Sequence, residues 1–147
     1  MELTGMLRGL DQLVTKLADI KVKAKEAEVL GVTRAAIALR DSIVQYVDEG
    51  HPDHPEIQTG RLKASIRYVV DAGSPTTAVV GSDAEYAPFV EFGHSQTPGR
   101  FVPALGKRLV ADHVKPYPFV RPAITDVFDG GIAQKLFAGA VKETLKL

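Results

Sequence analysis

The middle of the chain decides the fold, in the stretch Tyr86-Ala87-Pro88-Phe89-Val90-Glu91-Phe92-Gly93. Its three aromatic side chains recur at every third residue, which is a helical spacing. Proline is tolerated in the first turn of a helix, so Pro88 is compatible with a start just before it, and Gly93 is suited to close the helix. The stretch predicts a short aromatic helix within about residues 84–93.

The residues before this stretch predict a short helix followed by a β-hairpin. Thr59-Gly60-Arg61-Leu62-Lys63-Ala64-Ser65-Ile66 begins with a threonine that can cap the N-terminus of a helix running through Leu62 and Ile66. After it, Tyr68-Val69-Val70 and Thr77-Ala78-Val79-Val80 are rich in β-branched residues and flank the turn sequence Gly73-Ser74-Pro75. We therefore expect two antiparallel strands joined by a turn.

The first 50 residues predict amphipathic helices. Apolar residues spaced by three and four lie on one face of the first segment: Leu3, Met6, Leu7, Leu10, Leu13, Val14 and Leu17. A second series of the same spacing runs from Val29 to Tyr46, and Gly50 is a candidate C-terminal cap. The charged residues 21–26 between them either continue the first helix or join it to the second.

The residues after the aromatic stretch predict an excursion and then further helix. Pro98-Gly99 and Pro103 interrupt residues 95–116, for which we expect an extended loop of the kind that is functional or ordered by a partner, with room for a short helix at Leu105, Leu109 and Val110. Helical spacing returns at residues 120–128 and 132–145, on either side of Gly130-Gly131. The prediction is one α+β domain over residues 1–147, with N-terminal helices, a small antiparallel β-sheet, the short aromatic helix and a long C-terminal helix packed against the sheet.

Composition excludes several classes of protein. Eighteen basic and eighteen acidic residues among 147 cancel, so no overall positive field holds nucleic acid. The absence of cysteine excludes a disulfide framework, a thiolate zinc site and a cysteine nucleophile. The N-terminus lacks the pattern of a secretory signal, and no apolar run is long enough for a bilayer. We expect neither secretion by this route nor a membrane anchor.

The candidates for chemistry are outweighed by simpler interpretations. His51, Asp53, His54 and Glu56 could ligate a metal, and His113 could join them, but a local proline-broken cluster is more typical of a solvated loop. Carboxylates such as Asp83, Glu85 and Glu91 are common at turns and helix starts. We expect no enzyme, no cofactor and no metal. A metal-dependent hydrolase that uses the loop of His51, His54 and Glu56 stays open as an alternative.

A second alternative is a small nucleic-acid-binding module. Arg100 and Phe101, with Lys107 and Arg108 nearby, could contact phosphates and stack on bases. Arginine and aromatic residues are also enriched at the surfaces where proteins meet, and the neutral total charge favours that interpretation.

Taken together and in this order, the quoted phrases, with Phe119-Val120-Arg121-Pro122-Ala123 after them, resemble the neck and tail-component proteins of tailed bacteriophages (siphophages). The resemblance covers roughly residues 29–128. Two departures from the family pattern are His94 after the phrase that ends in Gly93, and a longer stretch before Tyr117-Pro118-Phe119.

The resemblance implies a structural virion protein at the head-to-tail junction, as a neck, tail-completion or tail-terminator-like component. It implies self-association into a six-fold ring, contact with connector, terminator or tail-tube proteins, transient passage of genomic DNA, and a place in the host cytoplasm during assembly. Aromatic and arginine side chains would anchor such contacts. The candidate interface residues are Tyr86, Phe89, Phe92, Arg100, Phe101, Phe119 and Arg121.

Overall fold

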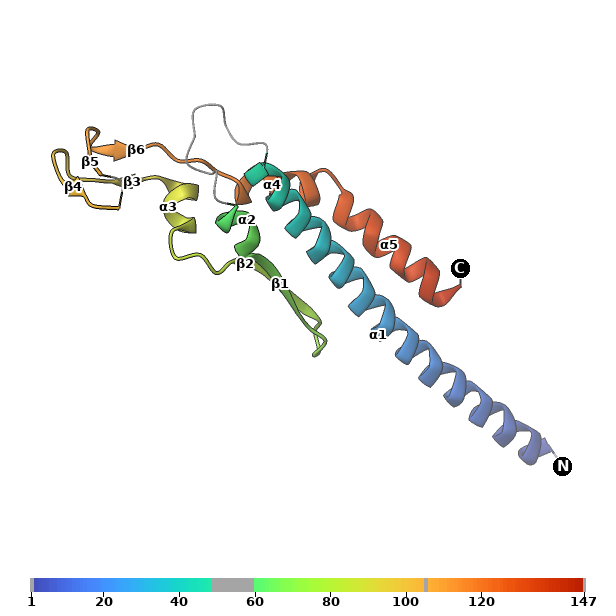
Figure 1. Ribbon diagram of the computed structural model, residues 1–147. Helices are drawn as coiled ribbons and strands as arrows, with labels where there is room; N and C mark the ends of the chain where they lie inside the picture. The colour runs from blue at the N-terminus through green and yellow to red at the C-terminus, as the bar shows by residue number, and fades with distance from the viewer. Residues whose placement is uncertain (1, 49–59, 105, 147) are drawn as a thin grey trace.

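The computed structural model describes residues 2–48, 60–104 and 106–146, and its longest element is a helix at the N-terminus. α1 (Glu2–Asp48) runs without interruption for 47 residues, about 70 Å at 1.5 Å per residue. The charged residues 21–26 therefore continue the first predicted helix into the second. Figure 1 shows an elongated molecule in which α1 extends beyond the rest of the chain at its N-terminal end.

A short helix and a β-hairpin follow, as predicted. α2 (Arg61–Ser65) leads directly into β1 (Ile66–Asp71), which pairs antiparallel with β2 (Thr77–Ser82). The register places Val69 opposite Val79 and Tyr68 opposite Val80. The Ser65 and Ser82 hydroxyl oxygens lie 2.5 Å apart and so join the start of β1 to the end of β2.

The aromatic helix is present, and the segment after it is more ordered than the predicted loop. α3 (Ala87–Phe92) ends at Gly93, which has a φ of 70°. Four two-residue strands follow and pair antiparallel as two ribbons: β3 (His94–Ser95) with β6 (His113–Val114), and β4 (Phe101–Val102) with β5 (Lys107–Arg108).

We call residues 94–118 the arm. Its strand pairs lie beyond α3, away from α5 and at the end of the molecule opposite the chain's N-terminus (Figure 1). In the described part of the arm no helix forms around Leu109 and Val110, because the Leu109 amide donates to the Arg100 carbonyl across the ribbon (2.9 Å).

The chain ends in helices that break where the paired glycines predict. α4 (Val120–Ile124) continues into a π-helical turn, η2 (Thr125–Asp129), and α5 (Ile132–Leu145) begins after Gly131, whose φ is 74°. The position of α5 differs from our expectation. It runs antiparallel along α1, whereas the hairpin packs on α1 from another side (Figure 1).

The contacts between α1 and α5 explain that position. The Arg34 guanidinium and the Glu143 carboxylate lie 2.7 Å apart, and the Phe137 ring covers Gly31 so closely that a Cβ there would lie 2.4 Å from it. The Tyr46 hydroxyl donates to Asp126 of η2 (2.6 Å). α1 is thus the common support of α5 and the hairpin.

The hydrophobic core lies where the C-terminal half of α1 meets α2, β1, α3 and α4. Among the described residues, its buried members are Ile43, Val47, Leu62, Ile66, Ala87, Phe119 and Ala123. The phrases at residues 59–66, 86–93 and 119–123 therefore each supply at least one core residue.

Several predictions fall on residues 49–59 and lie outside the described part of the chain. They are the Gly50 cap, the Thr59 cap and the loop containing His51, Asp53, His54 and Glu56. In the helices that the structure does describe, no segment is apolar enough over a sufficient length to cross a bilayer.

Candidate assembly surface

Glu91 joins the aromatic helix to the start of α4. Its side chain is buried, with 5% of the residue exposed, and its two carboxylate oxygens accept hydrogen bonds from the amides of Phe119 (2.7 Å), Val120 (2.9 Å) and Arg121 (3.2 Å). The first amides of a helix have no partner within the helix, and a carboxylate is favoured there by the helix dipole. Glu91 therefore has a structural use, which accounts for a buried acid without catalysis.

Two aromatic contacts hold the rings of Phe92 and Phe89, which lie close to Glu91 in the sequence of α3. The Arg121 guanidinium lies over the Phe92 ring, 4.9 Å from its centroid, and the Arg121 Nε is 3.9 Å from Glu91. The Phe89 and His94 rings meet edge to face with centroids 5.5 Å apart. Such contacts are favourable and orient rings that are otherwise in contact with water.

The outer side of α3 presents apolar surface to solvent. Ala87 and Glu91 face inward and are buried, whereas Phe89 and Phe92 are 55% and 58% exposed and Tyr86 is exposed beside them. We call Tyr86, Phe89, Phe92 and Arg121 the aromatic surface. Its rings are exposed although the helix that carries them is anchored, which is the arrangement expected of a preorganised contact site.

The arm is attached next to this surface at both of its ends. The Tyr117 amide donates to the Val90 carbonyl (2.7 Å), so both ends of the arm are held at α3. Gly93 is required at the junction because its φ is positive and a Cβ there would lie 2.5 Å from the Val114 carbonyl oxygen. Along the arm, Phe101 is half exposed and Val110 is 91% exposed.

The structure divides the seven predicted interface residues into three groups. Tyr86, Phe89, Phe92 and Arg121 lie together at α3 and α4. Arg100 and Phe101 lie on the arm, apart from α3 (Figure 1). Phe119 is 4% exposed and belongs to the core, so within this chain its ring is already packed.

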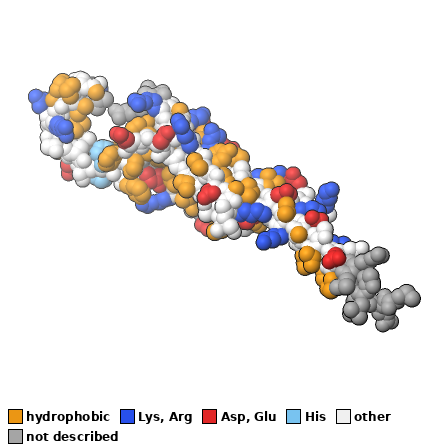
Figure 2. Space-filling view, turned by 90° about the horizontal axis from the view of Figure 1, so that it is seen from below, with side chains coloured by type: hydrophobic (Ala, Val, Ile, Leu, Met, Phe, Trp, Pro, Cys, Tyr) orange, Lys and Arg blue, Asp and Glu red, His pale blue; other side chains and the backbone are white. Residues whose placement is uncertain are grey.

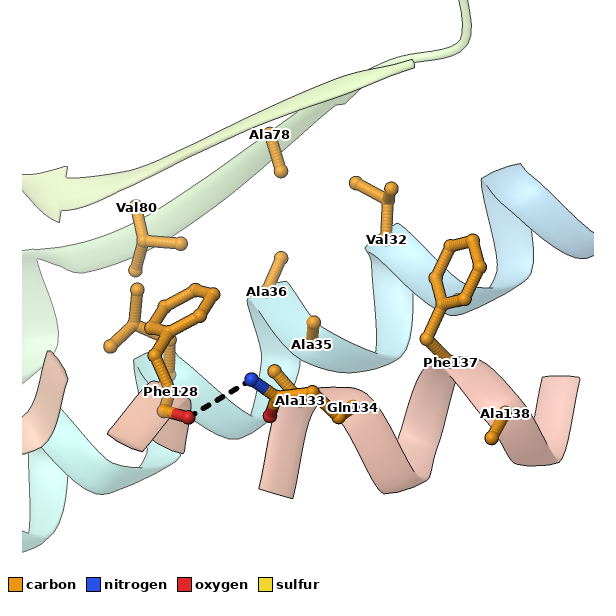
Figure 3. Close-up of a pocket in the computed structure, with 12 residues that line it drawn as sticks. Val32, Ala35, Ala36, Ala78, Val80, Phe128, Ala133, Gln134, Phe137 and Ala138 are labelled. Carbon is orange, nitrogen blue, oxygen red and sulfur yellow. Dashed lines mark hydrogen bonds between the residues drawn. The ribbon is translucent and has the colours of Figure 1, made fainter. Parts of the chain in front are cut away.

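An open groove is a further feature, and the sequence interpretation missed it. It has a volume of about 570 Å³ between α1, β2, η2 and α5, as Figure 3 shows. Its lining residues are Gly31, Val32, Ala35, Ala36, Leu39, Ala78, Val80, Phe128, Ala133, Gln134, Phe137 and Ala138. The available signal was the number of glycines and alanines on two helices that pack together, which leaves space beside the contact.

Besides Glu91, Asp83 and Glu28 are acidic residues that serve local structure. Asp83 lies 3.3 Å from the Arg67 guanidinium, and Glu28 accepts a hydrogen bond from the Thr76 amide (2.7 Å) and one from Lys25 (3.2 Å). The hydrogen bond from the Thr76 amide, followed by that from Lys25, lowers the pKa of Glu28 below its ordinary value. The hydrogen bond from the Thr76 amide to Glu28 joins α1 to the hairpin turn.

In the described ranges, which leave out the loop of His51 and His54, no group of three histidine or acidic side chains is placed to hold a metal ion. His94 and His113 lie on paired strands, but the register pairs them with Val114 and Ser95 respectively. The candidate functional features described above are apolar surfaces carried by anchored helices.

Comparison with known proteins identifies the family. No curated protein and no solved structure matches the chain. One family model does, over residues 6–93, and its description is "Bacteriophage HK97-gp10, putative tail-component". The match includes residues 6–28, which lie before the range of the resemblance, and it ends at Gly93, before the arm and α4. Because it covers more than half of the chain, this protein belongs to the HK97-gp10-like family of bacteriophage tail-component proteins.

Proposed function

We propose that this protein is a structural ring component at the phage head-to-tail junction, where it joins heads to tails as a neck, tail-completion or terminator-like protein. In this proposal residues 1–147 act as one domain without catalysis. The family supports a structural role in the virion. The observation that carries the proposal is the aromatic surface, whose exposed rings sit on a helix that the buried Glu91 fixes to α4.

The ring forms through a contact between two different faces of neighbouring subunits, which closes when the rotation between them divides a full turn. The aromatic surface supplies one of the two faces. Aromatic and arginine side chains provide most binding energy at such contacts when they become buried at the centre. On the face shown in Figure 2, hydrophobic side chains lie at both ends of the described molecule, which suits contacts in both directions around a ring.

The arm supplies a second contact, to an adjacent ring or to DNA in transit. Residues 94–118 contain four basic residues and one acidic residue, a net charge of +3 on a chain whose total is zero. The arm also carries the exposed Phe101 and Val110. A small local charge of this kind gives weak, salt-dependent attraction to phosphate, which lets DNA pass without holding it.

The test is a reconstruction of the neck of the parent phage together with a phage that carries Phe89→Asp and Phe92→Asp. We expect α3 at a subunit boundary in the neck, and in the variant we expect filled heads and free tails with a large loss of infectivity. Ile132→Asp, at an exposed aliphatic position of α5, is the matched control and should assemble normally. Absence of the protein from particles, or intact joining in the double variant, would refute the proposal.

A further inference from the structure

The N-terminal half of α1 has an apolar stripe with nothing to cover it. Every residue from Gly9 to Ala24 is exposed. Within this range Leu10, Leu13, Leu17 and Ile20 repeat at three, four and three residues, so they lie along one side of the helix, and each is more than half exposed. We call these four residues the α1 stripe. A helix of this length with a bare row of aliphatic side chains is typically completed by packing against another surface.

The same side of α1 is covered further along the chain. Continuing the spacing from Ile20 by four, three and four residues leads to Ala24, Ala27 and Gly31. Ala27 and Gly31 are buried, and Phe137 of α5 lies directly over Gly31. At Gly31, where α5 covers this side of α1, the residue is therefore the smallest possible, whereas from Leu10 to Ile20, where nothing covers it, the residues are large.

The groove has the complementary character. Six of its twelve lining residues are glycine or alanine, and only Gln134 among the twelve is polar. A cavity of about 150 Å³ admits one benzene molecule, so about 570 Å³ has room for roughly four apolar groups of that size. The α1 stripe presents four large aliphatic side chains. Figure 3 shows the short side chains of α1, β2 and α5 that leave this space open.

The stripe cannot reach the groove of its own chain. Both lie on one continuous helix, and Leu10 precedes Gly31 by 21 residues, about 32 Å along the axis. A stripe can enter a groove only between two molecules, and the contact then leaves a free stripe on one molecule and a free groove on the other. A contact of this kind propagates in one direction around a ring.

We propose that the α1 stripe of one copy of this chain docks in the groove between α1, β2 and α5 of a second copy. The inference deepens the proposed ring function by naming a further contact between neighbouring subunits, in addition to the one made by the aromatic surface, and it depends on that function only for closure of the ring. It also explains why the N-terminal half of α1 extends beyond α5.

Pairing of two stripes with each other is the competing arrangement, and charge disfavours it. Lys16, Lys21 and Lys23 flank the stripe. In a two-stranded coiled coil they occupy the positions next to the hydrophobic seam, where either orientation of the helices brings lysine close to lysine of the other copy. Like charges at such positions oppose pairing.

The test uses thiol cross-linking of the purified full chain, which has no native cysteine. Leu17→Cys and Ala138→Cys place one thiol in the stripe and one in the groove. With a short thiol-to-thiol cross-linker, the double variant should form a ladder of oligomers and an equal mixture of the two single variants should form a 17–138 dimer. Thr15→Cys is the matched control, because residues 15 and 17 lie on opposite sides of α1 and Thr15 is exposed.

The proposal is overturned if Leu17→Cys cross-links to itself as efficiently as to Ala138→Cys, which would indicate stripe-to-stripe pairing. It is also overturned if the Thr15 control cross-links equally well or if no 17–138 product forms.

Leu13→Asp with Leu17→Asp should abolish self-association in sedimentation experiments while the unfolding temperature is retained. If the cross-link between residues 17 and 138 forms but the protein is absent from phage particles, only the proposed function is refuted. If the protein is present in the neck but the cross-link between residues 17 and 138 does not form, only this inference is refuted.

Discussion

The two halves of α1 have similar amphipathic sequences and opposite surroundings. From Ala27 to Val47 the helix buries one side under α5 and another under the hairpin and α2, and Ile43 is 1% exposed. From Gly9 to Ala24 the helix is exposed all round. The comparison shows that an apolar stripe specifies that something must cover it but not which molecule does so. In the C-terminal half the chain supplies its own cover, and in the N-terminal half we infer that a second copy does.

The largest contrast should come from truncating one aliphatic residue in each half. Ile43→Ala creates a cavity in the core and should reduce the free energy of unfolding by about 2–5 kcal/mol. Leu17→Ala removes a side chain that is mostly in water in the monomer, so the free energy of unfolding should change by less than about 0.5 kcal/mol. Urea denaturation of dilute protein measures both. A large effect of Leu17→Ala at a concentration where the protein is monomeric would contradict the exposed stripe.

A smaller but still substantial effect is expected at Glu91. Glu91→Ala leaves three amides at the start of α4 without their acceptor and should destabilise the protein by about 2–3 kcal/mol. Glu91→Gln retains an acceptor oxygen and should cost less. Thermal unfolding followed by circular dichroism compares them. If Glu91→Ala and Glu91→Gln destabilise the protein equally, the hydrogen bonds to the amides are not the main contribution of Glu91 to stability.

Two glycines on α1 sharpen the comparison, because the same substitution should have opposite signs. Gly9→Ala meets no atom within 4 Å and gains helix propensity, so it should stabilise the protein by up to about 1 kcal/mol. Gly31→Ala gains the same propensity but pushes its Cβ into the Phe137 ring, which should cost about 1–3 kcal/mol. Calorimetry of the two variants and the wild-type protein measures the change in unfolding free energy that each substitution causes. Stabilisation by both would show that α5 moves away from α1 at little cost.

The most subtle effect concerns pH and Glu28, near the boundary between the two halves of α1. Its pKa is lowered in the folded protein, chiefly by the hydrogen bond from the Thr76 amide. Its stabilising contribution is therefore fully present above the unfolded-state pKa of about 4.5 and is lost as the pH falls through the lower folded value. The stability difference between the wild-type protein and Glu28→Gln should shrink over that acid range. A difference that does not vary with pH would mean that ionisation of Glu28 contributes nothing.

Local features of the fold could be predicted because they depend on neighbouring residues. The strand pair followed from the β-branched residues around Gly73, α3 from the spacing of its aromatic residues, and the break before α5 from the paired glycines. The strand pairing within the arm could not be predicted, because each strand has only two residues and is defined by a partner distant in sequence. The same limit applies to Glu91, because the residues around it in the sequence do not reveal that it accepts hydrogen bonds from the amides at the start of α4.

The candidate surface was partly predictable for a similar reason. Phe89 and Phe92 stood out as aromatic residues, but the spacing alone left open whether they face the core or solvent, and Phe119 looked equally suited to an interface. The structure separates them because Ala87, Val90 and Glu91 take the inner side of α3, whereas Phe119 is buried in the core at the start of α4.

The sequence by itself determined the periodicity of the helices and of β1 and β2, the turn between these strands and the family of the chain, since these depend on residues that are close along the backbone. The tertiary structure decided which apolar side chains are covered within the molecule and which are left for another one. That choice depends on how α5 and the hairpin pack on α1, and hence on contacts between side chains that are far apart in the sequence.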